Sequence, residues 1–82
     1  MKVLSVGTRR SFVRGGWVKV EITEKEFNAL WSGKELHYIE EIPCNDFILK
    51  ECFCTSVTAN INPNLPRFSA EYIFNDTERY QE

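Results

Sequence analysis

The stretch from residue 17 to residue 33 constrains the fold of this 82-residue chain more strongly than any other part of it. Its first half alternates apolar with charged residues, and this period of two predicts a strand with one buried face. The pattern changes at Thr23, where Thr-Glu-Lys-Glu has the form of a capping box. In that motif the Thr23 hydroxyl accepts a hydrogen bond from the N–H of Glu26, and the Glu26 carboxylate accepts one from the N–H of Thr23. The sequence therefore predicts a strand that runs directly into a helix.

The helix is predicted to span residues 24–32. Phe27, Leu30 and Trp31 recur at a spacing that places them on one helical face, and Gly33 can adopt the left-handed conformation that ends a helix. A helix of about nine residues is not stable alone in water. We therefore expect the face formed by these three side chains to dock on a sheet.

Five stretches of the chain have the apolar patterning of strands. We expect an α+β fold, with one short helix packed on a mostly antiparallel sheet of four or five strands, in the order strand, strand, helix and then three strands. The predicted strands are residues 1–6, 17–22, 36–42, 47–61 and 67–74. We assign residues 1–74 to a single α+β domain and residues 75–82 to a polar, acidic C-terminal tail.

The connection between the first two strands has two interpretations. Gly15 and Gly16 lie between two strand-like runs and can form the two-residue turn of a hairpin, which is our first choice. The alternative is a single loop over residues 8–16, which would display three arginines. Residue propensity does not decide between the two.

The longest predicted strand, residues 47–61, alternates over much of its length. We expect its odd-numbered apolar residues to form the core face and its even-numbered residues to face outward. Its length exceeds the usual strand length of about 3–10 residues, so we also expect a bend or bulge near Glu51, where a charge falls on the apolar face. The predicted core residues are Phe47, Leu49, Phe53, Val57, Ala59 and Ile61.

Cysteine and histidine do not form a pattern typical of a catalytic or metal site. The chain has three cysteines, and an odd number of thiols favours a reducing compartment over a disulfide scaffold. Cys52 and Cys54 lie two apart on a strand, without the tight turn that structural zinc sites use. A nucleophilic thiol needs a base beside it, and the one histidine is His37. Nothing in its spacing from Cys44 or Cys52 places it next to either thiol. We therefore expect free thiols, no metal, no cofactor, no enzymatic activity and a cytoplasmic location.

Charge is distributed unevenly along the chain. Residues 1–20 hold five basic residues and no acidic one, whereas residues 21–82 hold five basic and twelve acidic residues, which together give the net charge of −2. An aromatic side chain left outside the core is a candidate interface anchor, and the candidates are Trp17, Tyr38, Tyr72 and Tyr80. Ordinary packing in the core is the alternative for each of them, and the more common one. The residues that we assign to a partner-binding site are Arg9, Arg10, Arg14, Trp17 and Lys19.

These observations favour binding over catalysis. We expect a small non-enzymatic protein-binding module, such as an inhibitor, adaptor or accessory subunit, whose basic segment 7–17 meets an acidic surface of a partner protein. The alternative is single-stranded RNA or DNA, because basic side chains neutralise phosphates while exposed aromatic rings stack on bases. No apolar run exceeds three residues, so we expect no membrane partner. Edge strands leave a homodimer open as a further form of protein binding.

Overall fold

The strand-to-helix stretch folds as its sequence predicts. In the computed structural model, β2 (Gly16–Glu21) leads into α1 (Glu24–Trp31) through Thr23. The N–H of Thr23 donates to Glu26 Oε1 over 2.9 Å, and the N–H of Glu26 donates to Thr23 Oγ1 over 3.1 Å. These two bonds complete the predicted capping box. The helix ends one residue earlier than predicted, and Gly33 follows it with a φ of +74°.

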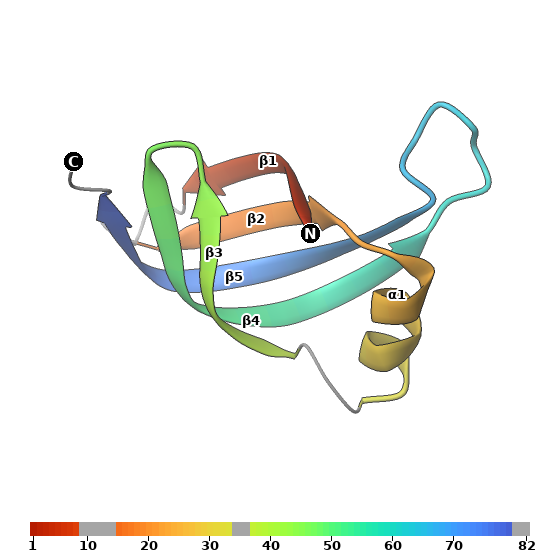
Figure 1. Cartoon of the computed structure of the whole chain (residues 1–82), viewed down its shortest axis with the longest axis horizontal. Coiled ribbons are helices and arrows are strands. Elements are labelled where there is room, and N and C mark those ends of the chain that lie inside the picture. Colours follow the sequence, from red (N-terminus) through yellow and green to blue (C-terminus); the bar gives the residue numbers. More distant parts are fainter. Residues whose placement is uncertain (9–14, 34–36, 80–82) are drawn as a thin grey trace.

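Five strands form one antiparallel sheet, and the helix packs on it (Figure 1). The order across the sheet is β1-β2-β5-β4-β3. Besides β2 and α1, the elements are β1 (Lys2–Thr8), β3 (Tyr38–Cys44), β4 (Phe47–Ala59) and β5 (Phe68–Arg79). The structure describes residues 1–8, 15–33 and 37–79. The predicted α+β fold and its element order are confirmed.

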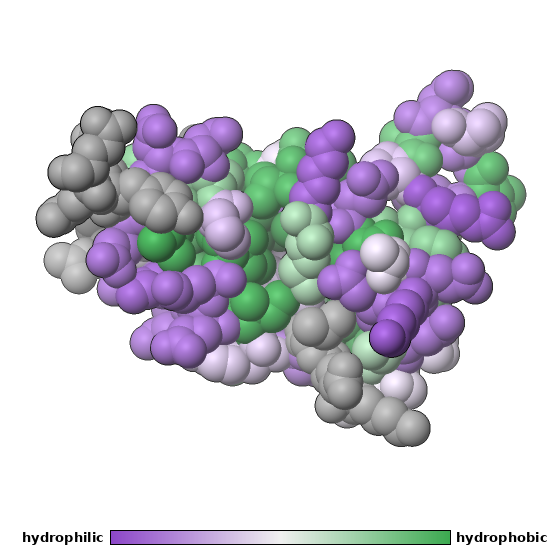
Figure 2. Space-filling view, viewed as in Figure 1, coloured by the Kyte–Doolittle hydropathy of each residue, from purple (hydrophilic) through white to green (hydrophobic). Residues whose placement is uncertain are grey.

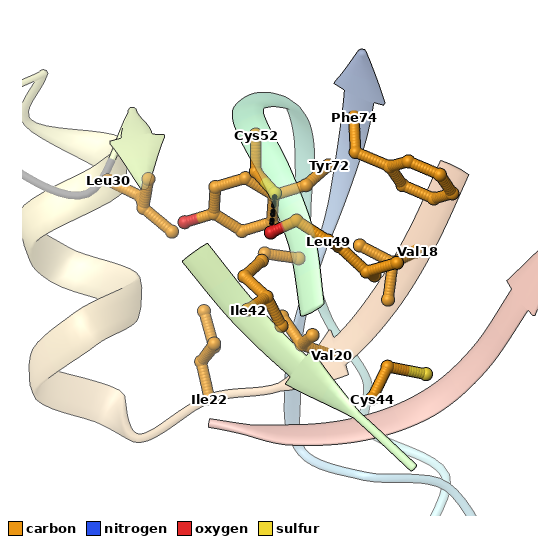
Figure 3. Packing of buried hydrophobic residues seen from close by; sticks show 11 residues of the cluster. Val18, Val20, Ile22, Leu30, Ile42, Cys44, Leu49, Cys52, Tyr72 and Phe74 are labelled. Atoms are coloured by element: carbon orange, nitrogen blue, oxygen red, sulfur yellow. Dashed lines mark hydrogen bonds between the residues drawn. The ribbon is translucent and has the colours of Figure 1, made fainter. Parts of the chain in front are cut away.

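The core lies between one face of the sheet, the helix and the hairpin of β3 and β4 (Figure 3). Tyr72 of β5 is fully buried, with its hydroxyl end toward Leu30 of the helix, and the Cys52 thiol donates to the carbonyl of Leu49 over 3.4 Å. The buried cluster consists of Val18, Val20, Ile22, Leu30, Ile42, Cys44, Leu49, Cys52, Ala70, Tyr72 and Phe74. We call the face of the sheet that carries these residues the inner face, and the opposite one the outer face.

The helix docks through fewer residues than the sequence predicts. Leu30 is buried, and the Phe27 ring lies 4.9 Å from that of Phe68. Trp31 is 74% exposed, so the prediction that it docks on the sheet is wrong. Successive helical residues are about 100° apart, so a helix that turns Leu30 toward the sheet turns Trp31 away. Its indole stacks on Phe27 instead, with ring centroids 6.1 Å apart.

The strand β4 changes its buried side at Glu51. Before Glu51 the odd-numbered Leu49 is buried, and after it the even-numbered Cys52 is buried. The odd-numbered Phe53 is 43% exposed. The prediction that Phe53 belongs to the core is therefore wrong, because the odd-numbered core face does not continue past Glu51. That residue has a φ of +55°, which bends the strand as predicted, and the hairpin of β3 and β4 stands over the sheet (Figure 1).

A second irregularity returns one odd-numbered residue of β4, Val57, to the core, whereas the predicted core residue Ala59 near the end of the strand is exposed. The register with β5 shifts between Cys54 and Ser56, and Val57 then packs against the core. The two ends of the predicted core face are nevertheless exposed, because Phe47 lies at the hairpin turn and Ile61 lies beyond the end of the strand. The alternation of apolar residues does not show how many irregularities interrupt a strand, and here there are two.

The predicted Gly15–Gly16 turn is wrong. Gly16 is a residue of β2 that lies opposite Thr8 of β1 on one side and Phe74 of β5 on the other. Its backbone therefore takes part in the sheet. β1 and β2 pair directly, as in the alternative of one loop between them, and most of that loop, residues 9–14, lies outside the described residues.

The last strand is longer than predicted. β5 continues to Arg79, five residues beyond the predicted end at Phe74. The residues after Phe74 pair with the first half of β4, where Thr77 lies opposite Leu49. Pairing with β4 thus keeps this polar segment in the strand. The prediction of a tail from residue 75 onward is therefore wrong as far as Arg79. Residues 80–82 lie outside the described residues.

Hydrophilic residues cover much of the surface seen in Figure 2, and hydrophobic residues form a band between the helix and the hairpin of β3 and β4. This band lies over the core, between the two elements that cover the inner face. In the part of the chain that the structure describes, no helix is long and apolar enough to cross a membrane.

Ser69 of β5 is buried, and its hydroxyl has no hydrogen-bond partner among the described residues. An unsatisfied buried hydroxyl costs about 1–3 kcal/mol. We therefore expect Ser69→Ala to raise the free energy of unfolding by about 1 kcal/mol, measured by urea denaturation. The exposed Ser56→Ala should change it by less than about 0.5 kcal/mol. A loss of stability in Ser69→Ala would contradict the expectation, since it would show that the hydroxyl is satisfied in solution.

Candidate partner-binding face

Two of the five predicted site residues, Trp17 and Lys19, lie on the outer face of the sheet. They alternate along β2 with Val18 and Val20, whose side chains are buried in the core. Lys19 is exposed and lies opposite Glu71 of β5. The remaining predicted site residues, which lie outside the described residues, are Arg9, Arg10 and Arg14. Trp17 and Lys19 are therefore the part of the predicted site that the structure brings together.

The indole of Trp17 packs against the bare backbone of Gly7. The two residues are cross-strand partners in β1 and β2. A Cβ atom at Gly7 would lie 2.5–2.6 Å from three atoms of the indole, much closer than van der Waals contact allows. Gly7 thus leaves the space in which the half-buried Trp17 ring rests on the outer face.

We expect Gly7→Ala to lower the free energy of unfolding by about 1–3 kcal/mol, because the new methyl group must displace the Trp17 ring. Urea denaturation measures the loss, and Trp17 fluorescence, recorded in a Trp31→Phe background, reports the ring's new environment. The double variant Gly7→Ala/Trp17→Ala removes the clash. Its loss should therefore be smaller than the sum of the two single losses, and strict additivity would contradict the contact.

Trp17 begins a row of side chains that crosses the outer face. The sheet register places Trp17 opposite Ile73, Ile73 opposite Phe53, and Phe53 opposite Tyr38. Directly opposite residues of an antiparallel pair share a face and lie in contact range. The rings of Tyr38 and Phe53 have centroids 4.9 Å apart, and these residues are 50% and 43% exposed. We call Trp17, Ile73, Phe53 and Tyr38 the outer row.

Sequence reasoning found half of the outer row. Trp17 and Tyr38 are among the candidate anchors, whereas the sequence places Phe53 in the core and assigns Ile73 no role. Two signals in the sequence point to the missing pair: the charge of Glu51 marks the position where the alternation of β4 breaks, and Ile73 falls between core positions of β5. For Tyr72 the alternative of ordinary packing is the correct one, because that side chain is fully buried. Tyr80 lies outside the described residues.

Carboxylates border the outer row where it ends at β3. A cleft of about 260 Å³ is lined by Tyr38, Glu40, Lys50, Glu51 and Asp76. Nζ of Lys50 forms a 2.8 Å ion pair with the Glu78 carboxylate, and this hydrogen bond and charge raise the pKa of Lys50. Among the described residues, no cation lies within 4.0 Å of the three carboxylates that line the cleft. This end of the outer row is therefore negatively charged.

The three cysteines are free thiols, and burial disfavours the ionisation of Cys52 and Cys54. Burial raises the pKa of Cys52 to about 11 and also raises the pKa of Cys54, although a hydrogen bond with the backbone of Ser56 works in the opposite direction for Cys54. A nucleophilic or metal-binding thiol must be a thiolate. His37 is exposed, and within the described ranges no three His, Cys, Asp or Glu residues are grouped so that they could hold a metal ion.

Comparison with known proteins adds no further assignment. No protein-family model, curated protein or solved structure matches the chain. The functional argument therefore depends on the chemistry of the described residues, and the outer row with its charged border is the feature that the core does not require.

Proposed function

We propose that the protein is a small non-enzymatic protein-binding module, such as an inhibitor, adaptor or accessory subunit of a larger complex. One observation carries the proposal: aromatic and aliphatic side chains form a continuous row across the outer face, opposite the face on which the helix packs. The apolar residues of the inner face form the core and are required for folding. The row places large apolar surface toward solvent, where it contributes little to stability.

The outer row has the properties of an interface centre. Aromatic side chains supply most of the binding energy in protein interfaces, and they do so best when their conformations are fixed before binding. Here each residue of the row projects from a paired strand, Trp17 rests on Gly7, and Tyr38 packs on Phe53. Binding would therefore order few side chains.

Single-stranded nucleic acid is the second candidate, and the same row favours it in one respect. Aromatic rings on an open sheet face can stack on unpaired bases, and Lys19 lies near Trp17. The charge of the border opposes this candidate, because Glu40, Glu51 and Glu71 would repel the phosphate backbone. We therefore rank protein above nucleic acid.

The sequence also bears on the charge of the partner's surface and on the compartment in which binding occurs. The sequence expectation of an acidic partner surface applies to segment 7–17, and it remains a prediction because most of that segment lies outside the described residues. A second copy of the chain is one such partner. We place the binding in the cytoplasm, since a reducing compartment fits three free thiols.

Capture from a lysate of the source organism, with and without nuclease, tests the proposal. The wild-type chain should retain a protein after nuclease treatment, and Phe53→Ser should lose it. Phe47→Ser is the matched control, because Phe47 lies on the same strand with 45% exposure but outside the outer row. Capture that disappears with nuclease and weakens steeply with salt would support nucleic acid instead. Capture that survives Phe53→Ser would overturn the role of the outer row.

A further inference from the structure

We infer that the outer row binds a basic protein segment, in which an apolar or aromatic residue is flanked by arginine or lysine. This inference rests on the proposed function, because it names the chemistry of the partner that the same face takes. The described charges that border the outer row carry it.

Among the described residues near the outer row, Lys50 and Lys19 each have an acidic neighbour. Lys50 is ion-paired with Glu78 over 2.8 Å, and Lys19 lies directly opposite Glu71 in the sheet. Lys50 also lines the cleft beside Tyr38, and the charge of Glu40 contributes to its raised pKa, but this one ammonium group faces three carboxylates of the cleft besides its partner Glu78. Those carboxylates belong to Glu40, Glu51 and Asp76. In the described part of the face, the apolar row is thus bordered by excess negative charge.

Charge complementarity selects the partner. A protein that docks on Phe53 and Tyr38 removes water from the neighbouring carboxylates, and this desolvation is unfavourable unless the partner supplies cations. An acidic partner would add like-charge repulsion at the same place. A basic partner instead forms charge-assisted hydrogen bonds with the carboxylates as it covers the row.

Arginine fits this border better than a simple point charge does. Its planar guanidinium can bond a carboxylate through two N–H groups and can also stack on an aromatic face. At the β3 end of the face, the Tyr38 ring lines the same cleft as the carboxylates of Glu40 and Glu51, and it packs on the Phe53 ring. One side chain could therefore satisfy both kinds of contact, while an adjacent apolar residue of the partner covers the rest of the row.

Peptide selection on the purified full chain tests the inference without a known partner. The probe is a library of random 12-residue peptides displayed on phage, selected on the immobilised wild-type chain and depleted on Phe53→Ser. The enriched peptides should carry at least one aromatic or large aliphatic residue and a positive net charge. The double variant Glu40→Gln/Glu51→Gln should bind them about 3- to 30-fold more weakly, as expected for the loss of two ion pairs at the border of an interface.

Glu24→Gln is the control for a general loss of negative charge, since Glu24 is an exposed residue of the helix and lies away from the outer row. It should leave peptide affinity unchanged. Enrichment of acidic or uncharged peptides, or equal binding to the double variant, would overturn the basic partner. If lysate capture nevertheless depends on Phe53, the proposed function stands without it. If neither lysate capture nor any peptide depends on Phe53, both proposals fail.

Discussion

Leu30→Ala should lower the free energy of unfolding by about 2–5 kcal/mol, the usual cost of truncating a buried leucine. Leu30 is 3% exposed and is the helical residue of the buried cluster. Total stability for a chain of this length is on the order of 4–12 kcal/mol, so the loss is a large fraction of it. Because the helix is too short to be stable alone, the variant should also lose helical signal in circular dichroism below the global transition.

The neighbouring residue supplies the control. Trp31→Ala removes a larger side chain, but that side chain is 74% exposed and contacts Phe27 rather than the sheet. We expect it to cost no more than about 1 kcal/mol, the value of one aromatic pair. Urea denaturation of both variants, at matched denaturant slopes, compares the two losses. A Trp31→Ala loss as large as that of Leu30→Ala would show that the indole docks in solution.

These two residues also show what the sequence could and could not predict. The capping box and the ending at Gly33 are local, so Thr23, Glu26 and Gly33 were sufficient to place the helix to within one residue. The choice between Leu30 and Trp31 depends on how the helix is rotated about its axis when it packs. That rotation is set by the space over β4 and β5, which no local pattern encodes.

The sheet divides in the same way between local and non-local information. Alternation predicted all five strands, but it placed Phe53 in the core because a period of two carries no record of a residue with positive φ. Polarity ended β5 at Phe74, whereas pairing with the bent half of β4 continues it to Arg79. The presence of each strand was thus predictable from the sequence. Which of its faces is buried, and where it ends, depend on the strands beside it.

The candidate site was less predictable than the fold. Charge and aromatic composition pointed to Trp17 and Lys19, which lie together on the outer face, but composition could not show that Trp17 aligns with Phe53 across β5. That alignment depends on the register of three strands, one of which, β2, is far from the other two in the sequence. The negative border near Tyr38 depends on the same register, and it differs in sign from the basic segment that first suggested a partner.

Phe53→Ala should weaken binding of the partner that the wild-type chain captures by at least about 30-fold, the effect of losing a central aromatic anchor. Phe53 lies inside the outer row, with Ile73 on one side and Tyr38 on the other. It is 43% exposed in the free protein, so the substitution should cost less stability than a core truncation. Titration calorimetry on the purified pair measures the affinity, and urea denaturation confirms the fold.

Tyr38 makes the test specific to the row. Its ring packs on that of Phe53, so each single alanine variant disturbs both anchors, and the double variant should lose less binding free energy than the two single losses added together. Phe47→Ala, with matched exposure on the same strand, should keep wild-type affinity. If Phe47→Ala weakens binding while Phe53→Ala does not, the interface lies at the hairpin turn and not on the outer row. Equal losses in both would indicate that general apolar surface, without the alignment across β5, accounts for the binding.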